Sequence, residues 1–178
     1  MEISHAQKDM REAYYDGATG AFISGLVWLA AGIVAMIISL KPAMATLFFG
    51  GMVIFPLSKL LSKALGRSGA HAKGNPLGKL AIESTFGLFM GLFIAFAVSL
   101  RLPEWFFSIM LIVIGVRYFV FSTVYGLRIY WVFAGVLCVS GVFCIILQYP
   151  SKFAALAGGI IEILFAIVIR VMAKRSPN

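Results

Sequence analysis

Six long apolar segments constrain this chain more than any other feature of its sequence. A helix needs roughly 20 consecutive apolar residues to cross the hydrocarbon core of a membrane. The chain has 178 residues, of which 61% are hydrophobic and 12% charged, so it carries more apolar surface than a soluble domain of this length can bury. We therefore predict an all-α membrane protein with six transmembrane helices, at residues 21–40, 43–58, 80–100, 105–126, 129–149 and 153–171.

The polar residues gather in three stretches outside this membrane domain of residues 21–171. Residues 2–16 alternate apolar and charged side chains near helical spacing, which predicts an amphipathic interfacial helix, with a linker up to residue 20. We expect a basic cytosolic loop at 59–79 and a basic cytosolic tail at 172–178. The second apolar segment is short and contains Pro56, so either its lysines reach back to the interface or its helix breaks near the proline.

The Lys and Arg residues are distributed unevenly around the six predicted spans. With the N-terminus in the cytosol, eleven of the 15 fall on the cytosolic side, three fall outside and one lies within a span. Such an excess on one side sets the orientation of membrane proteins, so we expect both termini in the cytosol. The net charge of +8 then reflects topology rather than nucleic-acid binding, and the 59–79 loop is a candidate site for anionic lipid headgroups.

Two ionisable residues fall within the predicted spans. Arg117 lies about twelve residues into the fourth span and Glu162 about ten into the sixth, which places both near mid-membrane at about 1.5 Å per residue. A charge in hydrocarbon is costly, so we expect these two residues to pair. The pair is either a device that fixes how two helices align or part of a gate or binding site on a polar path.

Further polar side chains accompany this pair. Tyr118, Ser122 and Tyr125 follow Arg117 along the fourth span, forming a stripe that we expect to face the protein interior. Glu83 lies about one turn inside the third span. It is either an acidic residue favoured by the helix dipole near an N-terminus or a carboxylate at the inner mouth of a path.

The three outer loops are alike, because each has a proline near its turn: Pro42, Pro103 and Pro150. Aligning the first and last prolines also aligns Gly50-Gly51 with Gly158-Gly159. This repeated spacing predicts three parallel hairpins, at about 21–58, 80–126 and 129–171, around a pseudo-threefold axis. The rhythm resembles that of the bacterial acid-resistance membrane protein family.

A more specific resemblance rests on short motifs spread over most of the chain. They are Ser24-Gly25-Leu26-Val27-Trp28, Gly50-Gly51-Met52-Val53-Ile54-Phe55-Pro56-Leu57, Gly74-Asn75-Pro76-Leu77, Arg117-Tyr118 and Tyr125-Gly126. In these the chain resembles a small bacterial membrane family of unknown function, the DUF7010 type. The resemblance implies a location in the bacterial inner membrane and implies no particular activity.

The sequence offers no pattern typical of an enzyme or of a cofactor or metal site. The two histidines lie in polar segments, and no nucleophile stands beside a base. Our leading hypothesis is a permeation or solute-binding path for an unknown small solute or ion, formed by Arg117, Glu162, Tyr118, Ser122, Tyr125 and Glu83. The competing hypothesis is a structural or stress-response membrane protein without transport, and in either case the chain is a candidate for assembly into a homo-oligomer.

Overall fold

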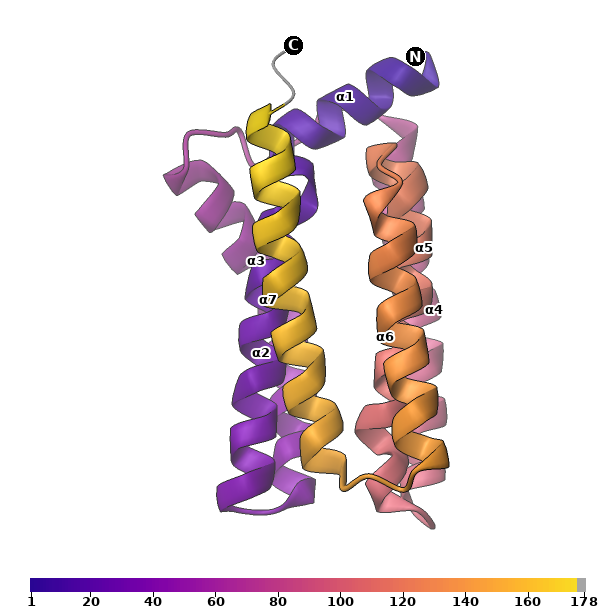
Figure 1. Cartoon of the computed structure of the whole chain (residues 1–178). Coiled ribbons are helices and arrows are strands. Elements are labelled where there is room, and N and C mark those ends of the chain that lie inside the picture. Colours follow the sequence, from indigo (N-terminus) through magenta and orange to yellow (C-terminus); the bar gives the residue numbers. More distant parts are fainter. Residues whose placement is uncertain (176–178) are drawn as a thin grey trace.

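The computed structural model describes residues 1–175, which form helices joined by short connections (Figure 1). The α-helices are α1 (Ile3–Tyr14), α2 (Ala18–Ile37), α3 (Leu40–Ala64), α4 (Pro76–Ser99), α5 (Phe106–Tyr125), α6 (Ile129–Ile146) and α7 (Ser151–Arg175), with two short 3-10 helices, η1 (Tyr15–Gly17) and η2 (Pro103–Trp105). Within the described residues six helices, α2 to α7, are long and apolar enough to span a membrane. The predicted all-α class and the six spans are therefore confirmed.

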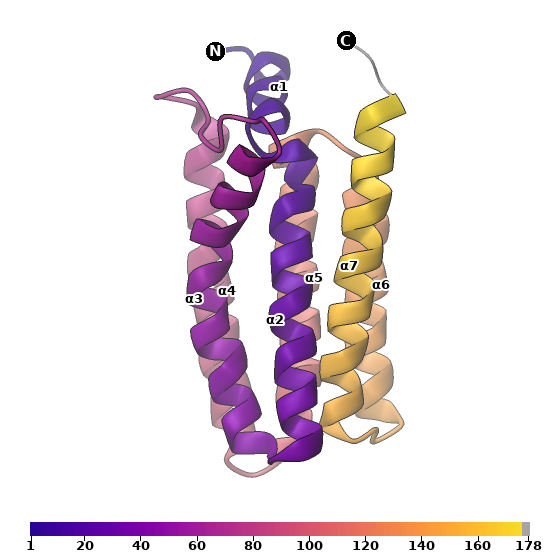
Figure 2. The ribbon, with the colours of Figure 1, turned by 90° about the vertical axis from the view of Figure 1, so that its left-hand side faces the viewer.

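The six long helices form two layers of three (Figures 1 and 2). One layer consists of α3, α2 and α7, with α2 in the middle, and the other consists of α4, α5 and α6, with α5 in the middle. The layers meet mainly where α7 contacts α5 and α6. The three hairpins expected from the sequence are thus not equivalent in their packing, because the first two each lie within one layer whereas α6 and α7 belong to different layers.

Helix α3 runs unbroken through Pro56, although the sequence left open a break near this residue. Figure 1 shows the turns near its C-terminal end tilting away from the rest of the bundle. A proline inside a helix removes one hydrogen bond and bends the axis without necessarily ending the helix. As a result Lys59 and Lys63, which were expected in a loop, belong to the last turns of α3.

Glycines bring the helices of each layer into backbone contact. A Cβ atom at Gly159 of α7 would lie 2.8 Å from the backbone nitrogen of Leu29 on α2, and one at Gly25 would lie 3.0 Å from the carbonyl oxygen of Gly159. In the other layer, a Cβ at Gly141 of α6 would lie 2.5 Å from the carbonyl oxygen of Ser108 on α5. Small residues are the usual means of close helix packing in membranes, and here they explain why α7 packs on α2.

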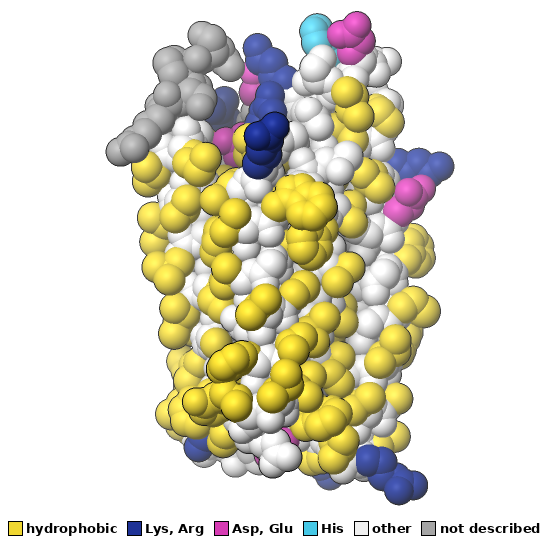
Figure 3. Space-filling view, turned by 45° about the vertical axis from the view of Figure 1, so that its right-hand side comes forward, with side chains coloured by type: hydrophobic (Ala, Val, Ile, Leu, Met, Phe, Trp, Pro, Cys, Tyr) yellow, Lys and Arg dark blue, Asp and Glu magenta, His cyan; other side chains and the backbone are white. Residues whose placement is uncertain are grey.

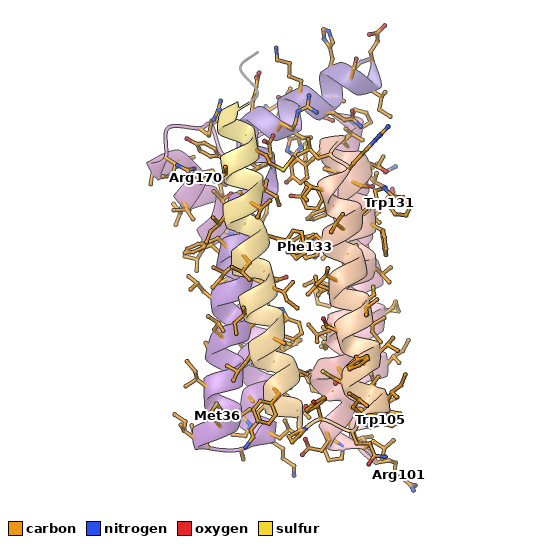
Figure 4. All side chains as sticks on the ribbon, viewed as in Figure 1. Met36, Arg101, Trp105, Trp131, Phe133 and Arg170 are labelled. Carbon is orange, nitrogen blue, oxygen red and sulfur yellow. The ribbon has the colours of Figure 1, made fainter. Side chains whose placement is uncertain are left out.

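Aromatic side chains fill the seam between the two layers. Trp28 of α2 meets Phe107 of α5 at 5.9 Å between ring centroids, and Phe133 of α6 stacks on Phe165 of α7 at 4.4 Å. Figure 4 shows Phe133 in the space between α6 and α7. The layers therefore touch through large side chains, whereas the helices within each layer touch through their backbones.

The amphipathic helix α1 lies across one end of the bundle, over both layers (Figure 1). We call this end, which carries the N-terminus and the last described turn of α7, the α1 end, and the opposite end the far end. The apolar side of α1, including Met10 and Tyr14, is buried. Figure 3 shows charged side chains gathered toward the two ends, with a hydrophobic belt between them, as expected for a protein surrounded by lipid.

Hydrogen bonds attach α1 to the bundle. Gln7 Nε2 and Arg11 Nη1 donate to the carbonyl oxygens of Thr123 and Tyr125, at 2.8 and 2.9 Å, and so satisfy acceptors at the C-terminal end of α5. Asp9 accepts a hydrogen bond from Asn75 Nδ2 at 2.7 Å, and Asn75 in turn caps α4. Helix α1 is therefore an integral part of the fold at this end.

Candidate functional site

Glu162 is the centre of the candidate site because it is a carboxylate completely buried in the middle of α7. The hydroxyl of Tyr118 on α5 donates a hydrogen bond to Glu162 Oε1 at 3.0 Å. Ser24 of α2 faces the same carboxylate. Ser24 Oγ and Glu162 Oε2 are both buried, and apart from each other neither has a hydrogen-bond partner among the described residues. Side chains from three helices and both layers thus converge on this point.

Arg117 does not form the expected ion pair with Glu162. The two ion pairs within 4.0 Å among the described residues are elsewhere, and the Arg117 guanidinium lies over the ring of Phe121 at 5.2 Å. The geometry of the helix explains this difference, because neighbouring residues point about 100° apart. Tyr118 faces α7 and reaches the Glu162 carboxylate. Arg117, the residue before it, therefore points to one side, toward Phe121 one turn nearer the α1 end.

Arg117 nevertheless remains close enough to matter electrostatically. It is half-buried, and the groups that act on its charge are Tyr118, Tyr125 and, least of the three, Glu162. Its Nε atom is buried without a hydrogen-bond partner among the described residues. A positive charge near a buried carboxylate helps to balance its negative charge even when the two groups do not touch.

A column of stacked aromatic rings extends from Glu162 toward the α1 end. Tyr118 stacks on Phe133 at 4.0 Å between centroids and on Tyr130 at 5.9 Å, and Tyr130 stacks on Tyr125 at 5.4 Å. Tyr130 donates a hydrogen bond to the carbonyl oxygen of Asp16 in η1 at 2.6 Å. The column therefore links the buried carboxylate to the turn between α1 and α2.

Two predicted site residues lie apart from Glu162 and its neighbours. Ser122 donates a hydrogen bond to the carbonyl oxygen of Phe119 in its own helix, at 2.7 Å. Glu83 is exposed on α4 and forms an ion pair with Lys79, one turn earlier, at 3.7 Å. Such an exposed pair contributes little, and Glu83 contacts none of the groups around Glu162.

Sequence reasoning missed Phe133 and Tyr130 as members of the site. They lie three residues apart on one face of α6, and Tyr118 and Tyr125 lie seven residues apart on one face of α5. Matching aromatic stripes on two consecutive helices are the signal that could have identified them. Ser24 carries a weaker signal, since it is a polar residue within an otherwise apolar segment.

The site combines chemistry that suits a small polar solute or an ion. A buried carboxylate lies beside the hydroxyl groups of Ser24 and Tyr118, and aromatic rings stack next to it. Aromatic faces and carboxylates both attract positively charged groups. Arg117 limits the net charge that such a site can hold.

Comparison with known proteins gives one match. The sequence profile described as "Family of unknown function (DUF7010)" covers residues 3–172. No curated protein and no solved structure matches the chain. The resemblance noted from the sequence motifs is confirmed, and it brings no activity with it.

Proposed function

The chain belongs to the DUF7010 family of unknown function, and we propose that it forms a permeation or solute-binding path through the bacterial inner membrane, with Glu162 as its central group. In this proposal the α1 end faces the cytosol, as the excess of Lys and Arg at that end favours. The path follows the seam between the two layers.

One observation carries the proposal: among the described residues, three buried polar atoms of the spans lack a hydrogen bond of good geometry, although the two on Ser24 and Glu162 face each other. They are Glu162 Oε2, Ser24 Oγ and Arg117 Nε. Buried polar groups in proteins are nearly always hydrogen-bonded, and exceptions concentrate at functional sites or where water or an ion binds. Ionisable groups within membrane spans likewise mark solute and ion pathways. A solute bound between the layers would satisfy these atoms.

The packing supports the seam as the place where the protein opens. Within each layer glycines hold helix backbones in direct contact, as at Gly25 and Gly159, so separating those helices would disrupt many contacts. Across the seam the contacts are between ring faces and side-chain tips, as at Phe133 and Phe165. Rotation of aromatic side chains can open such a seam without breaking a layer.

The proposal is tested by proton flux into liposomes that contain the purified protein. A potassium gradient with valinomycin supplies the driving force, and a trapped pH-sensitive dye reports the flux. We expect the wild type to conduct and Glu162→Gln, which removes the charge but keeps the shape, to reduce the rate at least about tenfold, equivalent to about 1.4 kcal/mol.

Glu2→Gln is the matched control, because it makes the same change at an exposed carboxylate outside the spans. It should conduct like the wild type. Equal flux through wild type and Glu162→Gln would exclude Glu162 as the central group, and a wild type that carries neither protons nor a solute would exclude the path.

The alternative is a structural or stress-response membrane protein without transport. The observation that favours it is the complete burial of Glu162 between stacked rings, which leaves no exposed surface on this residue. In that case Tyr118 and Glu162 would serve to align α5 with α7, a known use of buried polar groups. Glu162→Gln would then change the stability of the protein, and the wild type would show no flux.

A further inference from the structure

A second site lies at the α1 end, where a pocket of about 380 Å³ opens between α1, η1, α7 and the turn that joins α5 to α6. Three cationic side chains line it: Lys8 and Arg11 from α1, and Arg67 from the segment after α3. Apolar side chains, among them Ile129 and Ile169, complete the lining. Two carboxylates, Glu12 and Asp16, also line it, so its three cations outnumber its acidic groups by one. The pocket is partly apolar, and it lies near the ends of the spans.

The ring of Tyr15 contacts two guanidinium groups at this pocket. The guanidinium carbon of Arg67 lies 4.8 Å from the centroid of the Tyr15 ring, and that of Arg170 lies 4.7 Å from it. Figure 4 shows Arg170 near the α1 end of α7. Tyr15 is held by a hydrogen bond from its hydroxyl to the carbonyl oxygen of Leu65 and by a left-handed backbone conformation with φ of 51°. The Tyr15 ring therefore holds Arg67, a lining residue of the pocket, and a second guanidinium, that of Arg170, beside it.

These guanidinium groups are available to a ligand. Across residues 1–173, whose side chains are described, neither Arg11, Arg67 nor Arg170 has a carboxylate within 4.0 Å, and Arg170 Nη1 is buried without a hydrogen-bond partner. Lys8 forms an ion pair with Glu12 at 3.8 Å. Arg67 has no carboxylate within 4.0 Å among these residues and lies over the Tyr15 ring, so it is the cation of the pocket best placed to meet an anion.

The carboxylate of Asp16 also lines the pocket and would repel an anion. Unlike Glu12, it forms no ion pair within 4.0 Å among the described residues. Burial raises the pKa of its carboxyl group, although the charges of Arg11 and Arg67 act in the opposite direction. Its negative charge therefore weakens, but does not abolish, the attraction of the pocket for an anion.

We propose that this pocket binds a phosphate-bearing anion, either the headgroup of an anionic lipid or free phosphate. Guanidinium groups match phosphate oxygens with paired hydrogen bonds, and basic clusters at the ends of spans attract anionic headgroups. The apolar part of the lining suits the glycerol and upper acyl carbons of a lipid. This proposal is independent of the path at Glu162, because it rests on different residues at the end of the bundle.

The test uses the full chain in nanodiscs of phosphatidylcholine, with phosphatidylglycerol or inorganic phosphate as the probe. A ligand that binds only the folded protein raises its unfolding midpoint in a saturable way, which gives an apparent Kd. We expect one of the two probes to stabilise the wild type and Arg67→Gln to weaken its binding about tenfold, which corresponds to the loss of one charge-assisted contact. Lys73→Gln is the control, because it removes an exposed cation from the same end but outside the pocket.

A second variant, Asp16→Asn, should bind the anion more tightly than the wild type. Asn tolerates the left-handed conformation of this position, where φ is 57°, so the fold should be kept. Removing one negative charge about 6 Å from the bound anion, in water-like surroundings, should tighten binding about threefold. Stabilisation by phosphatidylglycerol alone identifies a lipid site, and stabilisation by phosphate identifies a site for the free anion; either supports the proposal. Identical binding by wild type, Arg67→Gln and Asp16→Asn would overturn it.

Discussion

Replacing Tyr118 with phenylalanine removes one hydroxyl group and leaves the ring stacked on Phe133. The change deletes the hydrogen bond of 3.0 Å to Glu162 Oε1, so the carboxylate keeps only the Ser24 hydroxyl facing it among the described residues. Hydrogen bonds to charged acceptors contribute about 1.5–3 kcal/mol in soluble proteins, whereas bonds between helices in membranes average about 0.6 and reach about 1.7 kcal/mol. Because both partners are almost fully buried, we expect a loss of about 1–2 kcal/mol, or five- to thirtyfold in the unfolding equilibrium.

The assay is reversible unfolding of the purified protein by sodium dodecyl sulfate in mixed micelles, followed by circular dichroism. Tyr149→Phe is the control, because it removes a hydroxyl from an exposed tyrosine near the far end. A double-mutant cycle with Glu162→Gln isolates the contribution of charge, and the cost of Tyr118→Phe should fall to about 0.5 kcal/mol when the acceptor is neutral. The reasoning is refuted if Tyr118→Phe is as stable as Tyr149→Phe, or if its cost is the same in both backgrounds.

Two further predictions concern packing and the attachment of α1. Gly159→Ala should destabilise the protein by about 1–3 kcal/mol, because its methyl group would lie 2.8 Å from the backbone nitrogen of Leu29. Gly51→Ala is the control and should be neutral or stabilising, because no atom lies within 4 Å of the added methyl group. Equal thermal stability of the two variants would contradict this prediction. Asn75→Ala removes the hydrogen bonds to Asp9 and to the backbone of α1, so trypsin should cut within α1 several-fold faster than in the wild type, and an unchanged rate in limited proteolysis would show that other contacts suffice.

The helices themselves could be predicted well because each one is determined by its own segment. An apolar stretch of membrane length forms a helix whatever its neighbours are, so most predicted ends lie within a few residues of the observed ones. The main exception is α3, which continues past Pro56 to Ala64 because the lysines in its last turns are tolerated at the end of a span. The arrangement of the helices in two layers could not be predicted from the sequence. Helix α7 packs on α2 through glycines of both helices, and the sequence does not show that these glycines are partners.

The candidate site was predicted in part for a similar reason. Position along the helix is enough to place Glu162 at mid-membrane, and the side chain of Tyr118 does meet it. The rotation of each helix about its axis depends on tertiary packing, and it decides that Tyr118 rather than Arg117 reaches the carboxylate. Tyr130 and Phe133 were missed because their role depends on how α6 faces α5, which periodicity within α6 alone does not determine.

The layer arrangement also determines the order in which the protein can assemble. Helix α2 is the first span to be synthesised, but the helix that packs against its glycine-bearing face is α7, formed by the last 25 described residues. At about 5–20 residues per second, α2 waits on the order of ten seconds before α7 leaves the ribosome. During this interval Gly25 and Ser24 face lipid or another protein, so the newly made chain holds an incomplete layer. A chain cut short before Ser151 would keep this unfilled surface permanently, and quality-control proteases could recognise it there.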